Sequence, residues 1–337
     1  MPEGFLDLGA RRTWYRTTGE ATDKTPLLLL HGGPGGASAN DIPFVEVVAR
    51  DRLVVQYDQL DSGRSSRLGD PSALTVDNFV REIDAVRGAL GLGDVHVWGQ
   101  SWGGALALSY ALTKPAGLRS VINASGFFSA QNEMDAVSQL RGGLRPVTLY
   151  ALLRCEQTLA GAAPLVLKPG RGVSSAKLAA QADVAARYFG LATSAPVQAA
   201  LRAGSYVPAL RKHVYPALLL EFVSRHVLRT RPVAPGLIVQ SVGLNAAVFE
   251  HMWGPFEHVA TGVLRDFDLT DRLPEIDVPV LMTSGAHESV LPAHADELAS
   301  RVPQAESVLF EDSAHCAEFE EPTRYTEVVV EFLARFP

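Results

Sequence analysis

The chain has 337 residues, of which 47% are hydrophobic and 20% are charged, and its formal net charge is −7. This composition is ordinary for a globular protein of one large domain or two modest ones, and it excludes wholesale disorder. A mildly acidic chain without a basic block is also a poor nucleic-acid binder. Two cysteines, Cys155 and Cys316, are too few for a disulfide framework.

The amino terminus has no apolar segment behind a basic start, and the longest purely aliphatic run is Leu27–Leu30. We therefore expect no signal peptide and no membrane-spanning segment. These features predict a soluble protein of the cytoplasm.

Short apolar runs alternate with helical patterns through the first third of the chain. Two segments around Gly9, FLDL and TWYR, are typical of a hairpin. Short apolar stretches bounded by turn residues predict buried strands, and apolar residues at helical spacing predict helices. The strands are expected over 26–30, 52–58, 94–99 and 118–125, and the helices over 74–90 and 105–114.

From about residue 130 to residue 251 the pattern is helical, with few strand signals. The helical pieces cover 134–144, 147–160, 176–190 and 217–229. Alternation then returns, with strands over 279–285 and 307–313 and helices over 293–302 and 323–336. This order predicts an α/β fold with a mostly parallel central sheet flanked by helices. Its core would comprise 1–129 and 252–337, interrupted by a helical insertion over 130–251.

The strongest chemical signal is the G-x-S-x-G segment Gly99-Gln100-Ser101-Trp102-Gly103, between a predicted strand and a predicted helix. The glycines permit a tight turn that exposes a serine hydroxyl at a helix N-terminus, where the Trp102 amide can face a developing oxyanion. The alternative is a glycine-rich turn with an incidental serine. The strand–turn–helix setting favours Ser101 as a nucleophile.

The segment HGGPG over 31–35 follows the first buried strand. In an α/β-hydrolase the second oxyanion amide comes from this loop, and Gly33 is the candidate because a missing Cβ lets the backbone approach substrate. A phosphate-binding loop is the alternative, but no Lys-Ser/Thr follows. His31 is expected to hold the loop rather than to react.

A serine nucleophile needs a base and an acid, which follow it in chain order in this fold. His315 lies directly after the last predicted strand, and Glu288 lies three residues past Gly285 at the end of the preceding strand. We therefore predict His315 as the base and Glu288 as the acid that orients it. Asp296 or Glu133 are the alternative acids, and Cys316 is expected to be a small buried residue.

Together these segments resemble the proline iminopeptidase family of α/β-hydrolases, including its amino-acid amidase branch. The resemblance spans nearly the whole chain. It is carried by HGGPGG (31–36), YDQLDSGRS (57–65), GQSWGG (99–104), RHVLR (225–229), NAAVFEHMWGPFEH (245–258), DLTDRLPEIDVPVLMTSG (268–285) and SAHCAEFEEP (313–322).

The resemblance implies an α/β-hydrolase fold, with the insertion as a cap (lid) over the serine. It also implies release of an N-terminal residue, often proline, from short peptides or amino-acid amides. Glu257 matches the family's glutamate that binds the substrate's free amino group, and a charged partner for an ammonium in a poorly hydrated pocket is chemically reasonable. A solvated glutamate at the hinge of the cap is the alternative. Glu221 is a weaker second candidate.

Four positions depart from the family pattern. Glu288 stands where the family usually has Asp, Phe256 and His258 flank Glu257 in place of a small polar residue and an aromatic one, and Asp61 replaces the first glycine of its loop. The pocket is therefore expected to differ from the usual proline-sized one.

The sequence thus predicts a serine hydrolase that needs no metal or organic cofactor and has a small-molecule or short-peptide partner with a free amino terminus. No metal-ligand spacing of His or Cys is present. One alternative is an esterase or amidase that acts on a biosynthetic intermediate with the same triad. The other is a non-catalytic binding protein on a hydrolase fold.

Overall fold

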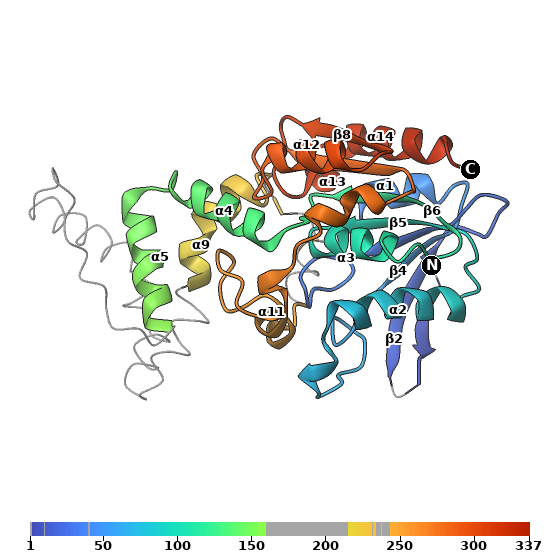
Figure 1. Cartoon of the computed structure of the whole chain (residues 1–337), viewed down its shortest axis with the longest axis horizontal. Coiled ribbons are helices and arrows are strands. Elements are labelled where there is room, and N and C mark those ends of the chain that lie inside the picture. Colours follow the sequence, from blue (N-terminus) through green and yellow to red (C-terminus); the bar gives the residue numbers. More distant parts are fainter. Residues whose placement is uncertain are drawn as a thin grey trace, which may run out of the picture. The chain divides into compact units, whose positions relative to one another are not determined.

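The computed structural model describes residues 2–9, 11–39, 41–159, 215–230, 232–233, 237 and 243–337. It divides into two compact units, one formed by 1–137 with 226–337 and the other by 138–225. The first unit contains the sheet and the helices that flank it (Figure 1). Among the described residues, none of the helices combines the length and apolarity that crossing a bilayer requires.

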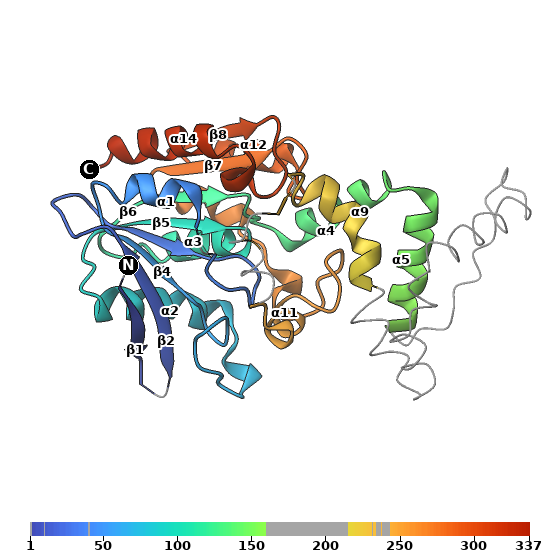
Figure 2. The same cartoon turned by 180° about the vertical axis from the view of Figure 1, so that it is seen from behind.

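An eight-stranded sheet forms the centre of the first unit, in the order β1-β2-β4-β3-β5-β6-β7-β8. β1 and β2 form an antiparallel hairpin at one edge, and β2 pairs antiparallel with β4 (Figure 2). All other neighbours are parallel, which confirms the predicted mostly parallel sheet. The strands are Glu3–Asp7, Arg12–Thr18, Leu27–Leu30, Val54–Tyr57, Val95–Gln100, Leu118–Ala124, Val280–Gly285 and Ala305–Phe310.

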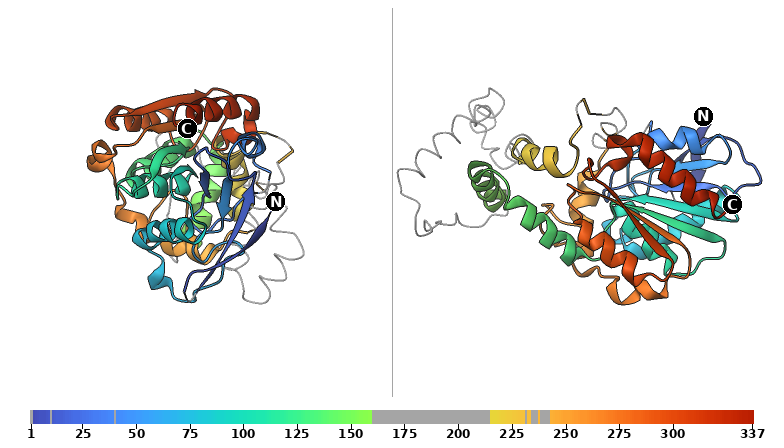
Figure 3. Two further views of the ribbon diagram at one scale, coloured as in Figure 1. Left: turned by 90° about the vertical axis from the view of Figure 1, so that its right-hand side faces the viewer. Right: turned by 90° about the horizontal axis from the view of Figure 1, so that it is seen from above.

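Apolar clusters bury both faces of this sheet, as a parallel sheet requires. Leu28 and Leu30 of β3 belong to one cluster and Leu27 and Leu29 to the other, because successive side chains of a strand point to opposite faces. Helices α2 (Val76–Ala89), α3 (Trp102–Ala111) and α12 (Pro292–Arg301) contribute to the first cluster, and α1 (Pro43–Val48), α13 (Ala317–Glu320) and α14 (Pro322–Ala334) to the second. The helices accordingly lie on both sides of the fan of strands (Figure 3).

Further segments of the first unit connect these layers. They are α11 (Ala246–Met252) and the short 3-10 helices Pro71–Ala73, Val263–Asp266 and Thr270–Glu275.

The second unit is helical where it is described. It contains the end of α4 (Ala130–Arg141), α5 (Pro146–Leu159) and nearly all of α9 (Tyr215–His226). A buried, bidentate ion pair joins Arg141 to Glu156, with Nη–Oε distances of 2.8 and 2.9 Å. The helix expected over 176–190 lies outside the described residues.

This unit spans fewer residues than the expected insertion over 130–251, since 130–137 and the described part of 226–251 belong to the first unit. His226 Nδ1 lies 2.9 Å from the carbonyl oxygen of His287, and the Asn245 amide donates to the Gly35 carbonyl at 2.7 Å.

Candidate active site

Ser101 occupies a strained turn between β5 and α3. Its φ of +56° and ψ of −120° are rare for a residue with a side chain. Its amide donates to Ala124 of the neighbouring β6 at 2.9 Å. A Cβ on Gly99 would lie 2.0 Å from the Gly103 carbonyl oxygen, and one on Gly103 would lie 2.2 Å from that of Leu30. Both glycines of G-x-S-x-G are therefore required for the chain to close this turn.

We expect Gly103→Ala to lower the free energy of unfolding by about 1–3 kcal/mol, because the added methyl group meets backbone rather than a movable side chain. Gly88→Ala is the matched control, since its Cβ would meet nothing within 4 Å inside α2. That change should stabilise the protein by up to about 1 kcal/mol. Urea unfolding of both variants checks the pair, and equal midpoints would contradict the packing argument.

The loop after β3 lies against the nucleophile. A Cβ on Gly32 would be 3.2 Å from Ser101 Cβ, and the next residue, Gly33, has a φ of +133°. Within the described part of the chain, the amides of Gly33 and Trp102 donate no hydrogen bond. The Trp102 amide is also in the first turn of α3, where the helix dipole favours negative charge. Two unused donors thus flank the region around Ser101.

His315 and Glu288 come from the loops after the last two strands, and the structure brings them together. His315 Nδ1 lies 3.1 Å from Glu288 Oε2, and the carboxylate is also bonded by the Gly285 amide at 2.9 Å and by the Ser125 hydroxyl. Gln100 Nε2 donates to the His315 carbonyl at 3.4 Å, which joins this loop to the turn of Ser101. No hydrogen bond between described residues connects Ser101 Oγ to the imidazole, and such bonds are often long without bound substrate.

The electrostatics of this pair suit a base that is held by an acid. Burial by itself would lower the pKa of His315, but the hydrogen bond and negative charge of Glu288 outweigh burial and raise it. The charges of Glu133 and Glu318 act in the same direction. The pKa of Glu288 is raised by burial, and its contact with His315 offsets part of that rise.

Two glutamates fix the loop that carries His315. Glu321 accepts from the Asp312 amide at 3.1 Å and from Ser313 Oγ at 2.6 Å, and Glu320 accepts from the Ala314 amide. These bonds turn the chain away from the sheet, so β8 ends at Phe310 rather than at 313 as predicted. Burial also raises the pKa of the neighbouring Cys316 thiol, which makes that residue a poor nucleophile.

Glu257 is exposed to solvent, and Trp253 Nε1 holds its backbone by donating to its carbonyl oxygen at 3.1 Å. Desolvation by surrounding protein raises the pKa of its carboxyl, and attraction to His315 offsets part of the rise. Phe256 and His258, the two departures beside it, stack on each other with ring centroids 5.8 Å apart.

Glu133, in the first turn of α4, is the carboxylate whose importance the sequence did not reveal. Its Oε2 is buried and has no hydrogen-bond partner among the described residues. Burial raises its pKa to about 8; His315 opposes this rise, and the charges of Glu288 and Glu257 add to it. The sequence suggested Glu133 only as an alternative acid to Glu288, and in the structure it is Glu288 that contacts the His315 imidazole. Asp296, the other alternative acid, lies on α12, and its Oδ1 instead accepts a hydrogen bond from Ser307 Oγ on β8.

Glu221 lies in the second unit, and its carboxylate is already engaged. It pairs with Arg145 at 2.8 Å and Arg225 at 2.7 Å, and Thr148 Oγ1 donates to it at 2.5 Å. These partners already neutralise the charge of Glu221, which disfavours the expected amine-binding role.

Asp61, the fourth departure, bonds within its own loop. Its φ is +57°, a value that suits the glycine usual there, and its Oδ1 accepts from the Leu68 amide at 3.0 Å.

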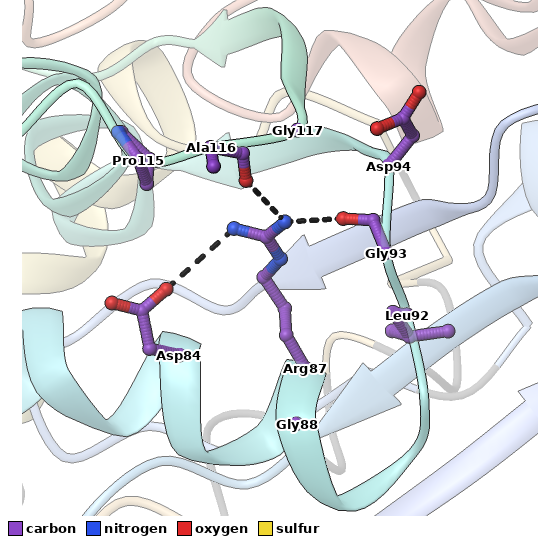
Figure 4. A pocket seen from close by; sticks show the side chains of 9 residues that line it. All are labelled: Asp84, Arg87, Gly88, Leu92, Gly93, Asp94, Pro115, Ala116 and Gly117. Atoms are coloured by element: carbon purple, nitrogen blue, oxygen red, sulfur yellow. Dashed lines mark hydrogen bonds and ion pairs between the residues drawn. The ribbon is translucent and has the colours of Figure 1, made fainter.

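A cavity of about 540 Å³ lies at the amino ends of β5 and β6 (Figure 4), whereas Ser101 follows the carboxyl end of β5. Arg87 fills its centre: its guanidinium pairs with Asp84 at 3.5 Å and donates to the carbonyls of Ala116 and Gly93. The arginine thereby joins two connecting loops, and the cavity is separate from the triad residues.

The chain matches the alpha/beta hydrolase fold family over residues 25–322. It is 32% identical over 333 residues to a proline iminopeptidase of Heyndrickxia coagulans, which covers 98% of each chain. The crystal structure of a Mycobacterium smegmatis proline iminopeptidase aligns with a TM-score of 0.76 and 28% identity over 99% of this chain and 98% of that one. The structure of VinJ aligns with a TM-score of 0.78 and 29% identity over 100% and 99%. These matches confirm the resemblance drawn from the motifs, and the chain belongs to the proline iminopeptidase family of α/β-hydrolases.

Proposed function

We propose that this hydrolase is a serine aminopeptidase that releases an N-terminal residue from short peptides or amino-acid amides. Ser101 is the nucleophile, His315 is the base that takes its proton, and Glu288 holds the imidazole and stabilises its charged form. The amides of Gly33 and Trp102 bind the oxyanion. The observation that carries this proposal is the combination of a serine in a strained turn, an imidazole bonded to a buried carboxylate and two unused amides.

The reaction then proceeds in two steps. Ser101 Oγ attacks the carbonyl carbon of the first residue, its proton passes to His315, and the protonated imidazole gives that proton to the leaving amine. Water, deprotonated by His315, next attacks the acyl-serine ester, and the imidazolium returns that proton to Ser101 Oγ as the ester bond breaks and the free residue is released. The residues assigned here supply each proton transfer.

The substrate's ammonium group is proposed to bind Glu257, a solvent-accessible carboxylate that interacts electrostatically with His315. Glu133, a second carboxyl whose pKa burial raises, belongs to the same electrostatic group. Proline or another small apolar residue is the proposed first residue. The segment 130–251, which contains the second compact unit, is proposed to act as the cap.

A panel of aminoacyl arylamides, proline included, tests this proposal when each member is compared with its N-acetylated twin. The wild type should cleave the free-amine members with a preference of at least about 10–100-fold, since a lost charge-assisted bond costs about 1.5–3 kcal/mol. Glu257→Gln should reduce that preference by a similar factor, mainly through KM. Glu311→Gln, an exposed glutamate near the His315 loop, is the matched control and should leave it unchanged.

An esterase or amidase with a larger, non-peptide substrate is the second candidate. The buried Phe256, stacked on His258 beside Glu257, favours it because this segment departs from the family's pattern. Equal cleavage of the acetylated twins, or turnover of simple esters alone, would support this candidate and overturn the aminopeptidase. Failure of the protein to react with an active-serine phosphonate would instead indicate a non-catalytic binding protein.

A further inference from the structure

We infer that Gln59 is a positioning residue whose carboxamide sets the spacing of the two oxyanion amides. The inference rests on the proposed function, because it assumes that Gly33 and Trp102 bind the oxyanion. Gln59 lies in the loop after β4, far in sequence from both of these residues, and its side chain is completely buried.

Both ends of the carboxamide are used, one toward each oxyanion loop. Gln59 Nε2 donates to the carbonyl oxygen of His31 at 2.8 Å, directly before the glycines of that loop. Gln59 Oε1 accepts from Trp102 Nε1 at 2.9 Å, so it holds the side chain of the very residue that supplies the other amide. One planar group therefore links the two loops through two bonds of fixed geometry.

A third bond fixes the protonation of His31. The Gln59 backbone amide donates to His31 Nε2 at 3.0 Å, so this nitrogen is an acceptor and the proton lies on Nδ1. Nδ1 lies 2.8 Å from the Gly32 carbonyl oxygen, which then accepts that proton's hydrogen bond. Burial lowers the pKa of His31 and keeps the ring neutral, as this arrangement needs. His31 thus acts inside the loop rather than on substrate.

The backbone of Gln59 is itself anchored. The adjacent Leu60 amide donates to the buried Glu82 at 2.8 Å, and the Ser62 amide donates to the Gln59 carbonyl at 3.0 Å. The preceding Asp58 is buried and accepts from the Ser38 and Arg64 amides, each at 2.7 Å. The carboxamide therefore projects from a rigid loop and transmits that rigidity to both amides.

No other side chain of this size replaces both bonds. Methionine fills similar space but leaves the Trp102 indole N–H and the His31 carbonyl buried without partners. Glutamate keeps an acceptor for Trp102 but, when ionised, has no donor for His31. Either change is expected to let the loops move relative to each other, and a displacement near 1 Å can cost about 100-fold in rate.

The test compares Gln59→Met with Gln56→Met. Gln56 is the matched control: it is also buried, it lies on β4, and its Nε2 donates to the carbonyl of Ala39 at 3.0 Å, six residues beyond Gly33 at the far end of the loop after β3. We expect Gln59→Met to lower kcat by about 10–100-fold with KM within about twofold, because oxyanion contacts strengthen in the transition state. Gln56→Met should leave kcat within about twofold.

An aminoacyl aldehyde, which forms a tetrahedral adduct on serine, provides the second measurement. Its inhibition constant should rise in Gln59→Met by the same factor by which kcat falls. If Gln59→Met does not fold, as judged by circular dichroism, Gln59→Glu takes its place with the same expectation. A rise in KM at constant kcat, or equal losses in the Gln56 and Gln59 variants, would overturn the inference.

Gln59→Met and Gln56→Met are also assayed on a simple nitrophenyl ester, a substrate that has no amino group for the enzyme to bind. If the wild type hydrolyses only the ester, the aminopeptidase proposal fails while the ratio of the two variants still tests Gln59. If Ser101→Ala retains the wild-type rate on every substrate, the proposed nucleophile itself is wrong.

Discussion

Ser101→Ala is expected to reduce arylamide hydrolysis by about 10⁴-fold or more. In the proposed mechanism Ser101 Oγ becomes acylated, and neither the amides of Gly33 and Trp102 nor the His315–Glu288 pair can replace it. The residual rate would report the contribution of the oxyanion amides and of binding alone. Steady-state kinetics on the best panel member, with purified variant, measures it.

The stability of this variant should not fall, because alanine and serine meet the same difficulty at a φ of +56°. Ser101→Gly should raise the melting temperature, since glycine adopts positive φ without steric cost. Both variants should lose labelling by a fluorophosphonate. Labelling that persists at another serine, with activity retained, would remove Ser101 from the mechanism.

Glu288→Gln is expected to lower kcat by about 10³–10⁴-fold while substrate binding changes little. The amide can occupy the same space, but it no longer stabilises the imidazolium and it favours the wrong tautomer of His315. Glu288→Asp should be less severe, because it keeps the charge and loses only one methylene of reach. Thermal melts accompany the kinetics, since Glu288 is buried and also bonds the Gly285 amide.

The pH dependence of kcat/KM tests the pairing of His315 with Glu288, because the expected direction of its shift is known. His315 must be neutral to accept the proton, and its pKa is raised above the ordinary 6.5. The wild-type kcat/KM should therefore fall on the acid side at a pH above 6.5, and removal of the Glu288 charge should move that limb to lower pH. Glu318→Gln, which removes a nearby charge without removing the hydrogen bond, should move the limb slightly and keep most of kcat. An acid limb that stays in place in Glu288→Gln would contradict the pairing.

The strands of the core were predictable because each is a short apolar run that ends in turn residues. Leu27–Leu30 and Val280–Gly285 lie within a residue of the predicted ranges, and the described helices α5 and α12 are also close to theirs. The six-residue α1 was missed, because Pro43–Val48 is too short for a helical period to be distinguished.

The site could be predicted only in part. Ser101, His315 and Glu288 stand at strand ends, where topology alone places side chains at one edge of a parallel sheet. The pairing of Gln59 with Trp102 and the missing partner of Glu133 could not be predicted, because they depend on how loops distant in sequence pack. The motif around Gln59 marked the segment, but local pattern gives no indication of a side chain's partner.

The strands of the sheet come from two separate segments of the chain. β6 ends at Ala124 and its neighbour β7 begins only at Val280, so a ribosome completes six strands long before it supplies the last two. The emerging chain then holds the turn of Ser101 but lacks both His315 and Glu288, and one edge of β6 lacks its partner. On the proposed mechanism, newly made protein is therefore inactive until its final segment emerges, and the open edge of β6 is where a stalled or truncated chain would aggregate.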